Sequence, residues 1–241
     1  MTSTTVSALG VSITVDSRWA ADYAHFAASP RSSGTELGTL DRAATLQAFT
    51  GAAIDQTSLY CVHAAVVHCP TGAIAFPGRS GLGKSNLALA LTQAGFGYLS
   101  DEVLAVDPAD GAVDFFPRAV GVDSRTLARL GLTVVEGESA GAADTDREVI
   151  VAPDSVGHVG PPRSELAAVV VAVREGTHPA GLTPTTPEHV AGQLLEHSFN
   201  HYRSPVDSIR TVAGVARGVS AWTLHYADAR DAAGVLAATF L

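Results

Sequence analysis

Residues 78–85 of the chain read Gly78-Arg79-Ser80-Gly81-Leu82-Gly83-Lys84-Ser85, which fits the pattern G-x-x-x-x-G-K-[ST]. The apolar run 73–77 before it predicts a short buried strand, and the run 86–94 after it predicts a helix that Gly95 ends. A glycine-rich turn between a strand and a helix N-terminus presents backbone N–H groups that favour a polyphosphate. The motif and its flanks therefore predict a nucleoside triphosphate site.

Two residues of this motif have specific expected roles. Lys84 is expected to reach the β- and γ-phosphates, and the Ser85 hydroxyl to bind Mg²⁺. Lys84 is also the only lysine of the chain, which argues against a general surface role. The alternative is a glycine-rich turn that binds nothing, and the fit of both flanks disfavours it. The expected cofactors are ATP and Mg²⁺, and the residues expected around the nucleotide are Gly78, Arg79, Ser80, Gly81, Leu82, Gly83, Lys84, Ser85 and Asn86.

Composition narrows the class of protein. A chain of 241 residues is long enough for an α/β domain with a small appendage. The net charge of −9 disfavours a nucleic-acid partner. No apolar run approaches the ~20 residues of a membrane span, and the start 1–5 lacks the basic stretch of a secretory signal. Cys61 and Cys69 are the only cysteines, which fits a reducing compartment. We therefore expect a cytoplasmic protein with no membrane partner.

Hydrophobic patterning predicts an α/β fold in two parts. Residues 1–57 are expected to form a small β-containing element, with an edge strand at 11–15, a turn at 30–34 and a helix at 40–49 that begins near Asp41. Residues 58–241 are expected to form the main domain. Its expected strands are 59–67, 73–77, 98–106 (a strand pair or one bent strand), 113–117, 166–173 and 221–226, with a hairpin turn at 107–111. Its expected helices are 86–94, 123–131, 187–198, 209–217 and 228–241, and the acidic, glycine-rich segment 136–160 is expected to be mobile or partly ordered.

A second chemical feature is the acidic pair Asp101-Glu102, which begins sixteen residues beyond Ser85. Phosphoryl transfer needs one carboxylate near Mg²⁺ and one that takes the proton of the acceptor hydroxyl. Adjacent side chains of an extended segment point to opposite faces, so we expect the two acids to have different functions. An isolated acidic pair is more often a solvated strand end, but its place after the motif helix favours a functional pair.

A histidine lies on the apolar run before the motif. His63 in such a run is more often a hydrogen-bonded core residue than a participant in chemistry. A zinc site formed with Cys61, His68 and Cys69 is the other interpretation. Their spacing lacks a paired C-x-x-C or H-x-x-x-H, so we do not predict a metal there.

Taken together, these features resemble a known family. The segment Val62-His63-Ala64-Ala65, then the glycine-rich motif, then the segment from Ala94 to Glu102 occur in the order found in the catalytic domain of HPr kinase/phosphorylase. The resemblance is tight over 61–117 and holds only in outline over 166–241. It implies a P-loop fold related to phosphoenolpyruvate carboxykinase. For the two acids, it also implies that Asp101 is the general base toward the acceptor serine and that Glu102 is the second acid near the metal. It further implies that Ser85 is a metal ligand, that Lys84 binds phosphate and that His63 lies near the active site.

Departures from the family pattern shape the functional expectation. Glu102 replaces an aspartate, and we find no match to the family's long N-terminal domain or to its downstream Arg-Gly-rich signature. Short relatives include kinases that modify a serine hydroxyl of ribosomally made peptides. We therefore expect an ATP- and Mg²⁺-dependent kinase that acts on an alcohol, with a serine of a peptide or protein as the acceptor.

Several alternatives remain open at this point. One is a kinase for a small molecule resembling free serine, and another is a regulator that binds ATP without transferring phosphate. Because HPr kinases are hexamers, the resemblance also implies a homo-oligomer. Arg118 is a weaker candidate for a phosphate or acceptor contact. The expected catalytic residues are Asp101, His63 and Lys84, and the expected metal ligands are Ser85, Glu102 and Asp101.

Overall fold

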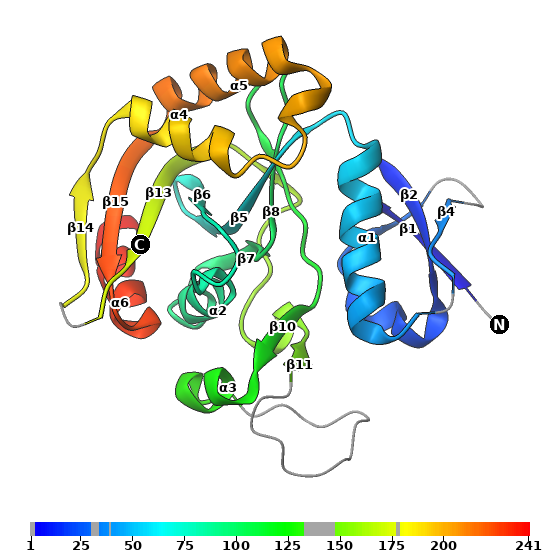
Figure 1. The fold of residues 1–241 in the computed structure, drawn as a ribbon. Helices are drawn as coiled ribbons and strands as arrows, with labels where there is room; N and C mark the ends of the chain where they lie inside the picture. Colours follow the sequence, from blue (N-terminus) through cyan, green and yellow to red (C-terminus); the bar gives the residue numbers. More distant parts are fainter. Residues whose placement is uncertain (1–2, 30–33, 39, 133–147, 177–178) are drawn as a thin grey trace.

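The computed structural model describes residues 3–29, 34–38, 40–132, 148–176 and 179–241. Over these ranges the chain is a mixed α/β protein with a four-strand sheet near the N-terminus, a two-strand sheet and a mixed nine-strand sheet (Figure 1). The expected α/β class and the small N-terminal β-containing element are confirmed.

The N-terminal sheet is built on a tight hairpin. Leu9 and Gly10 both have positive φ values, 51° and 77°, as a two-residue hairpin turn requires. The strand expected at 11–15 is present, but it is not at the edge, because it has one neighbour on each side in the order β3-β1-β2-β4. These strands are β1 (Ser3–Ala8), β2 (Val11–Asp16), β3 (Ala27–Ala28) and β4 (Thr35–Glu36), with a 3-10 helix η1 (Ser17–Tyr23) between β2 and β3.

The first helix, α1 (Arg42–Gln56), begins where expected and ends later. The Asp41 side chain caps it by accepting a hydrogen bond from the Ala44 backbone N–H at 2.8 Å. It runs seven residues beyond the expected end because Ala53 and Ile54 continue its buried face.

Four buried aromatic rings, Tyr23, Phe26, Phe49 and Phe116, form what we call the aromatic cluster. The Phe49 ring lies 4.4 Å from Tyr23, 5.1 Å from Phe26 and 5.8 Å from Phe116, measured between centroids. Phe116 belongs to the segment that follows β9, whereas the other three rings belong to the N-terminal element. The aromatic cluster therefore joins the N-terminal element to the main sheet.

The nine-strand sheet combines parallel and antiparallel pairs. Three of its strands, β6, β13 and β15, run parallel to one another, and the remaining pairs are antiparallel. The order is β12-β9-β8-β5-β6-β13-β15-β14, with β7 paired to β5 off this path. The bounds are β5 (Tyr60–Cys69), β6 (Gly72–Pro77), β7 (Gly97–Ser100), β8 (Val103–Val106), β9 (Val113–Asp114), β12 (Arg163–Ser164), β13 (Leu166–Arg174), β14 (Gly181–Pro184) and β15 (Ser220–Tyr226).

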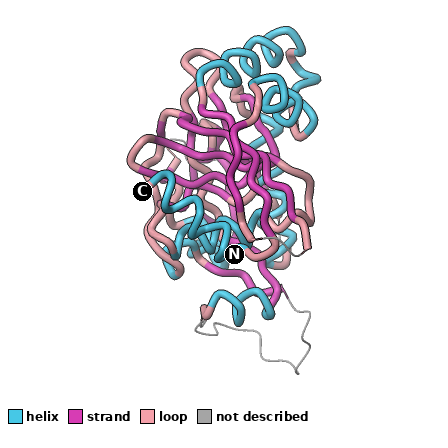
Figure 2. The backbone as a smooth tube through the Cα atoms, turned by 90° about the vertical axis from the view of Figure 1, so that its left-hand side faces the viewer, coloured by secondary structure: helices cyan, strands magenta, loops and turns pink. Residues whose placement is uncertain are grey.

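Helices cover both faces of this sheet (Figures 1 and 2). Along β5, Val62 and Ala64 pack with the helices of one face, whereas Ala65 and Val67 pack with those of the other, as strand alternation requires. The first face carries α4 (Pro187–Glu196) and α5 (Pro205–Gly218), and the second carries α2 (Lys84–Gln93) and α6 (Ala229–Phe240).

Helix α2 begins two residues before the expected start and ends as predicted. Gly95 adopts a left-handed φ of 106°. The Gly95 N–H bonds to Thr92 O at 3.2 Å, and the Phe96 N–H bonds to Leu91 O at 3.1 Å. This pair of hydrogen bonds is the glycine-dependent helix ending that the sequence indicates.

Most of the other expected elements are present with shifted bounds. The segment 98–106 is a strand pair, the hairpin turn at 107–111 is confirmed, and α5 begins four residues before its expected start. Of the segment 136–160, residues 136–147 lie outside the described residues, as do 30–33 of the expected turn, and residues 148–160 include a strand and a 3-10 helix. No sequence pattern predicted β14. The remaining elements are β10 (Val120–Asp123), α3 (Ser124–Leu130), β11 (Glu148–Val151), η2 (Pro153–Ser155) and η3 (His201–Arg203).

No helix in the described ranges is long and apolar enough to span a bilayer.

Replacing Phe49 by alanine tests the role of the aromatic cluster. Phe49 is fully buried, so Phe49→Ala is expected to lower the free energy of unfolding by about 3–5 kcal/mol. Urea unfolding followed by circular dichroism measures this. Ile209→Ala, at a side chain that is 58% exposed, is the control and is expected to change stability by less than about 0.5 kcal/mol. Equal effects of the two substitutions would contradict the assignment.

Candidate functional site

The glycine-rich loop 78–83 joins β6 to the N-terminus of α2. All residues of β6 are buried, so the strand fixes the start of the loop. Gly83 is the residue before α2, has a φ of 91° and provides no side-chain cap. The first backbone N–H groups of an uncapped helix have no intrahelical partner and carry the positive end of the helix dipole. The loop side of α2 therefore suits an anion.

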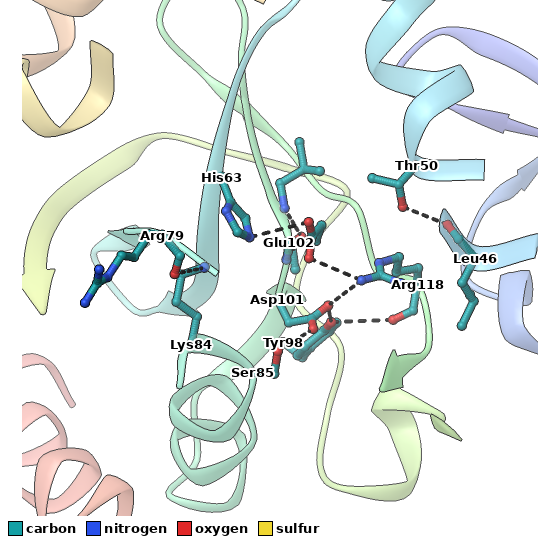
Figure 3. A network of polar contacts seen from close by, with 12 residues as sticks. Leu46, Thr50, His63, Arg79, Lys84, Ser85, Tyr98, Asp101, Glu102 and Arg118 are labelled. Carbon is teal, nitrogen blue, oxygen red and sulfur yellow. Dashed lines mark hydrogen bonds and ion pairs between the residues drawn. The ribbon is translucent and has the colours of Figure 1, made fainter. Parts of the chain in front are cut away.

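Lys84 lies on the first turn of α2 and is buried, with 6% of its surface exposed. Its Nζ donates to the carbonyl oxygen of Arg79 at 3.0 Å, which folds the side chain back over the loop (Figure 3). Burial lowers the pKa of Lys84, and the nearby carboxylates of Glu102 and Asp101 oppose that shift. The ammonium group is thus held between the loop and the acidic pair.

The acidic pair lies in a bend between β7 and β8, and not on an extended strand as expected. The Ser100 hydroxyl makes this bend by accepting hydrogen bonds from the backbone N–H groups of Glu102, at 3.1 Å, and Val103, at 2.9 Å. Strand alternation therefore does not set the directions of the two acids. Their side chains nevertheless have mostly different partners.

Asp101 is buried, with 2% of its surface exposed, and faces the start of α2. Its Oδ2 accepts a hydrogen bond from Ser85 Oγ at 2.8 Å, and its Oδ1 accepts one from the Tyr98 hydroxyl at 3.0 Å. Burial raises the pKa of Tyr98 well above its usual value, so this phenol stays protonated and donates. Both oxygens of Asp101 are therefore engaged.

Glu102 is more accessible, with 29% of its side chain exposed. Its Oε1 lies 3.4 Å from Nε2 of His63, and its Oε2 accepts from the Arg118 guanidinium at 3.3 Å. Burial alone would raise the pKa of Glu102, but His63, Arg118 and Lys84 together hold it below its usual value. Glu102 is thus an ionised carboxylate on the open side of the acidic pair.

Arg118 lies behind both acids. Its Nη2 atom is 3.9 Å from Asp101 Oδ1 and 3.3 Å from Glu102 Oε2. Burial acts to lower the pKa of Arg118, but Asp101 and Glu102 outweigh it, and the pKa stays above its usual value. Among the described residues, Arg118 Nε has no hydrogen-bond partner. Figure 3 shows the guanidinium between the carboxylates and α1.

His63 is held by its backbone as well as by its ring. Its N–H bonds to the carbonyl oxygen of His197 at 2.8 Å, and its ring centroid lies 5.4 Å from that of Phe199. The segment after α4 therefore fixes the position of His63 on β5. Only 17% of the His63 side chain is exposed, which leaves its ring edge available next to Glu102.

The structure brings together only part of the expected set. His63, Lys84, Ser85, Asp101 and Glu102 converge, and Arg118 joins them. Asn86 points elsewhere, because its amide donates to Thr126 Oγ1 on α3 at 3.0 Å. Arg79, Ser80 and Gly81 are exposed on the loop.

Sequence reasoning missed two contributors to the site, Tyr98 and His197. Tyr98 lies in an apolar strand, where an aromatic residue signals only a core position. His197 acts through its backbone, which no residue pattern reveals.

The described residues contain no group of three or more His, Cys, Asp or Glu side chains arranged to hold a metal ion. Cys61, His63, His68 and Cys69 do not form such a group either. Mg²⁺ usually takes only one or two carboxylates, together with waters and phosphate oxygens. The hydroxyl of Ser85 next to the carboxylate of Asp101 offers ligands of that kind.

A scan against known protein families finds no family that matches the chain, and a search among curated proteins finds no significant match. The contacts of the site are therefore the basis for a functional proposal.

The lowered pKa of Glu102 makes a testable prediction for stability. Its folded-state pKa is below its unfolded value of about 4.5, so its contribution is present above that pH and is lost as the pH falls through the folded pKa. Glu102→Gln is expected to lower the melting temperature at pH 6 and to lower it less at pH 3, because protonation of the wild-type carboxyl increases as the pH falls. Thermal unfolding at both pH values measures this, and a constant difference would contradict it.

Proposed function

We propose that the chain is an ATP- and Mg²⁺-dependent kinase that transfers the γ-phosphoryl group to an alcohol, with a serine hydroxyl of a peptide or protein as the acceptor. The observation that carries the proposal is the 2.8 Å hydrogen bond from Ser85 Oγ to Asp101 Oδ2 at the start of α2. A hydroxyl on the first helical turn and a carboxylate from a neighbouring strand end are the metal-holding pair of P-loop phosphoryl-transfer sites.

The same contacts also support a more specific fold assignment for loop 78–83 and the main domain. We take loop 78–83 with α2 to be a P-loop, within a domain of the HPr kinase and phosphoenolpyruvate carboxykinase type. The uncapped start of α2, the buried Lys84 and the acidic bend after β7 support this assignment. Residues 58–241 would then form the catalytic domain, and 1–57 the smaller element.

The contacts favour roles for the two acids that differ from the roles that the resemblance implies. Asp101 is bound to Ser85 and has both oxygens engaged, which suits a group that holds Mg²⁺. Glu102 is more exposed and lies beside His63, which suits a group that meets the acceptor. We therefore assign the general base to Glu102, oriented by His63, and the metal side to Asp101 and Ser85.

In the reaction, the acceptor oxygen forms a bond to the γ-phosphorus while the bond to the β,γ-bridging oxygen breaks and ADP leaves. The proton of the acceptor hydroxyl passes to a carboxylate oxygen of Glu102. Lys84 and the N–H groups at the start of α2 hold the phosphates in place and stabilise their charge. When bound, Mg²⁺ supplies further neutralisation of the charge on the transferring group.

A transfer assay tests the reaction itself. The protein is incubated with γ-³²P-ATP and Mg²⁺, with host lysate separated into macromolecular and small-molecule fractions as acceptors. We expect label in the macromolecular fraction, and its loss with Lys84→Met. Label only in small molecules would instead identify a metabolite kinase. ATP binding without Lys84-dependent label in any fraction would indicate a regulator and would overturn the proposal.

The division between the acids has its own test. Glu102→Gln is expected to lower the transfer rate at saturating Mg²⁺ by about 10²-fold or more, the scale of a lost general base, without changing the Mg²⁺ concentration required. Asp101→Asn is expected to raise the Mg²⁺ concentration at half-maximal rate. Transfer rates over a Mg²⁺ titration separate these effects. The reverse pattern, with Asp101→Asn slow at saturating Mg²⁺ and unchanged in Mg²⁺ requirement, would restore the base role to Asp101.

A further inference from the structure

A groove opens beside loop 78–83, between the start of α2, helix α3 and the start of α6. Figure 1 shows α2 between α3 and α6, and the carboxyl ends of the parallel strands β13 and β15 lead to the same place. Ligands of α/β sheets bind at the carboxyl ends of parallel strands, so the groove lies on the expected edge. Gly83 of the loop and Asn86 of α2 form part of its wall.

Positive charge gathers in this groove, although the chain as a whole carries a net charge of −9. Arg129, Arg174 and Arg230 line it and are all exposed. Within the described part of the chain, none of the three guanidinium groups forms an ion pair. Among the described residues that line the groove, Asp228 is the one acid, and its side chain caps α6 by accepting from the Arg230 backbone N–H at 2.8 Å. An unpaired cluster of this kind favours an anion.

The arginines lie at different distances from the loop. Nη1 of Arg174 is 3.3 Å from the position that a Cβ of Gly83 would take, so Arg174 lies directly beside the loop. Nη2 of Arg230 is 3.3 Å from the corresponding position at Gly131, at the end of α3. Arg129, on the last turn of α3, belongs to this outer part. The groove therefore leads away from the loop with positive charge along it.

We propose that the groove binds the nucleoside end of the nucleotide, with Arg174 beside the α-phosphate and with Arg129 and Arg230 around the ribose and base. This inference rests on the proposed function, because it assumes that the β- and γ-phosphates occupy the loop. Leu130 and Ala229 also line the groove and give it apolar surface. Apolar surface suits a base better than it suits a second phosphate group.

Comparing two ligands tests the inference. The affinities of ATP and of inorganic tripolyphosphate, each with Mg²⁺, are measured by calorimetry. Tripolyphosphate carries the same phosphate chain without a nucleoside. The double variant Arg129→Gln/Arg230→Gln is expected to lower the affinity for ATP by about tenfold or more, the scale of lost charge-assisted hydrogen bonds, and that for tripolyphosphate by less than about twofold. Arg217→Gln, an exposed arginine on α5, is the matched control and is expected to change neither.

Other outcomes are decisive as well. Equal losses for both ligands would mean that the arginines act only as a general positive field, and unchanged affinities would mean that the groove is not used, so either result overturns the inference. Wild-type protein that binds neither ligand overturns the inference together with the proposed function. ATP affinity that depends on the arginines, without any phosphoryl transfer, supports the groove and overturns the kinase. If the double variant does not fold, Arg230→Gln alone is measured in its place.

Discussion

The guanidinium of Arg118 connects the two carboxylates of the site with the packing of the N-terminal element. It lies within 4 Å of Asp101 and Glu102, on the segment that Phe116 anchors in the aromatic cluster. A buried charge is tolerated only when it is paired, and losing one partner of such a pair typically costs about 3–5 kcal/mol. The positions of both acids therefore depend on N-terminal packing that touches neither of them directly.

The bend at Ser100 is the second constraint on the site. Because the Ser100 hydroxyl accepts hydrogen bonds from the backbone N–H groups of Glu102 and Val103, the chain turns between β7 and β8 and presents the two acids side by side. Asp101 then bonds to Ser85 and Tyr98, while Glu102 meets His63. Neighbouring residues of the same charge thus obtain different surroundings, which is the basis for assigning them different functions.

The parallel strands explain why loop and groove occur together. The strands β6, β13 and β15 end at the same edge of the sheet, and each is followed by a segment that contributes to this region. From β6 comes the glycine-rich loop, and the ends of β13 and β15 bring Arg174 and the start of α6. A phosphate site at the loop and a nucleoside site in the groove would be adjacent parts of one edge.

The sequence by itself determined the features that depend on near neighbours along the chain. These include the glycine-rich loop between a buried strand and a helix, the ending of α2 at Gly95 and the α/β class, because each follows from local periodicity or backbone conformation. Tertiary structure decided the inner position of β2, the pairing of Arg118 with both acids and the gathering of Arg129, Arg174 and Arg230. Those features join segments that are distant in the chain, and their energies come from strand pairing, burial and charge contacts that no single segment contains.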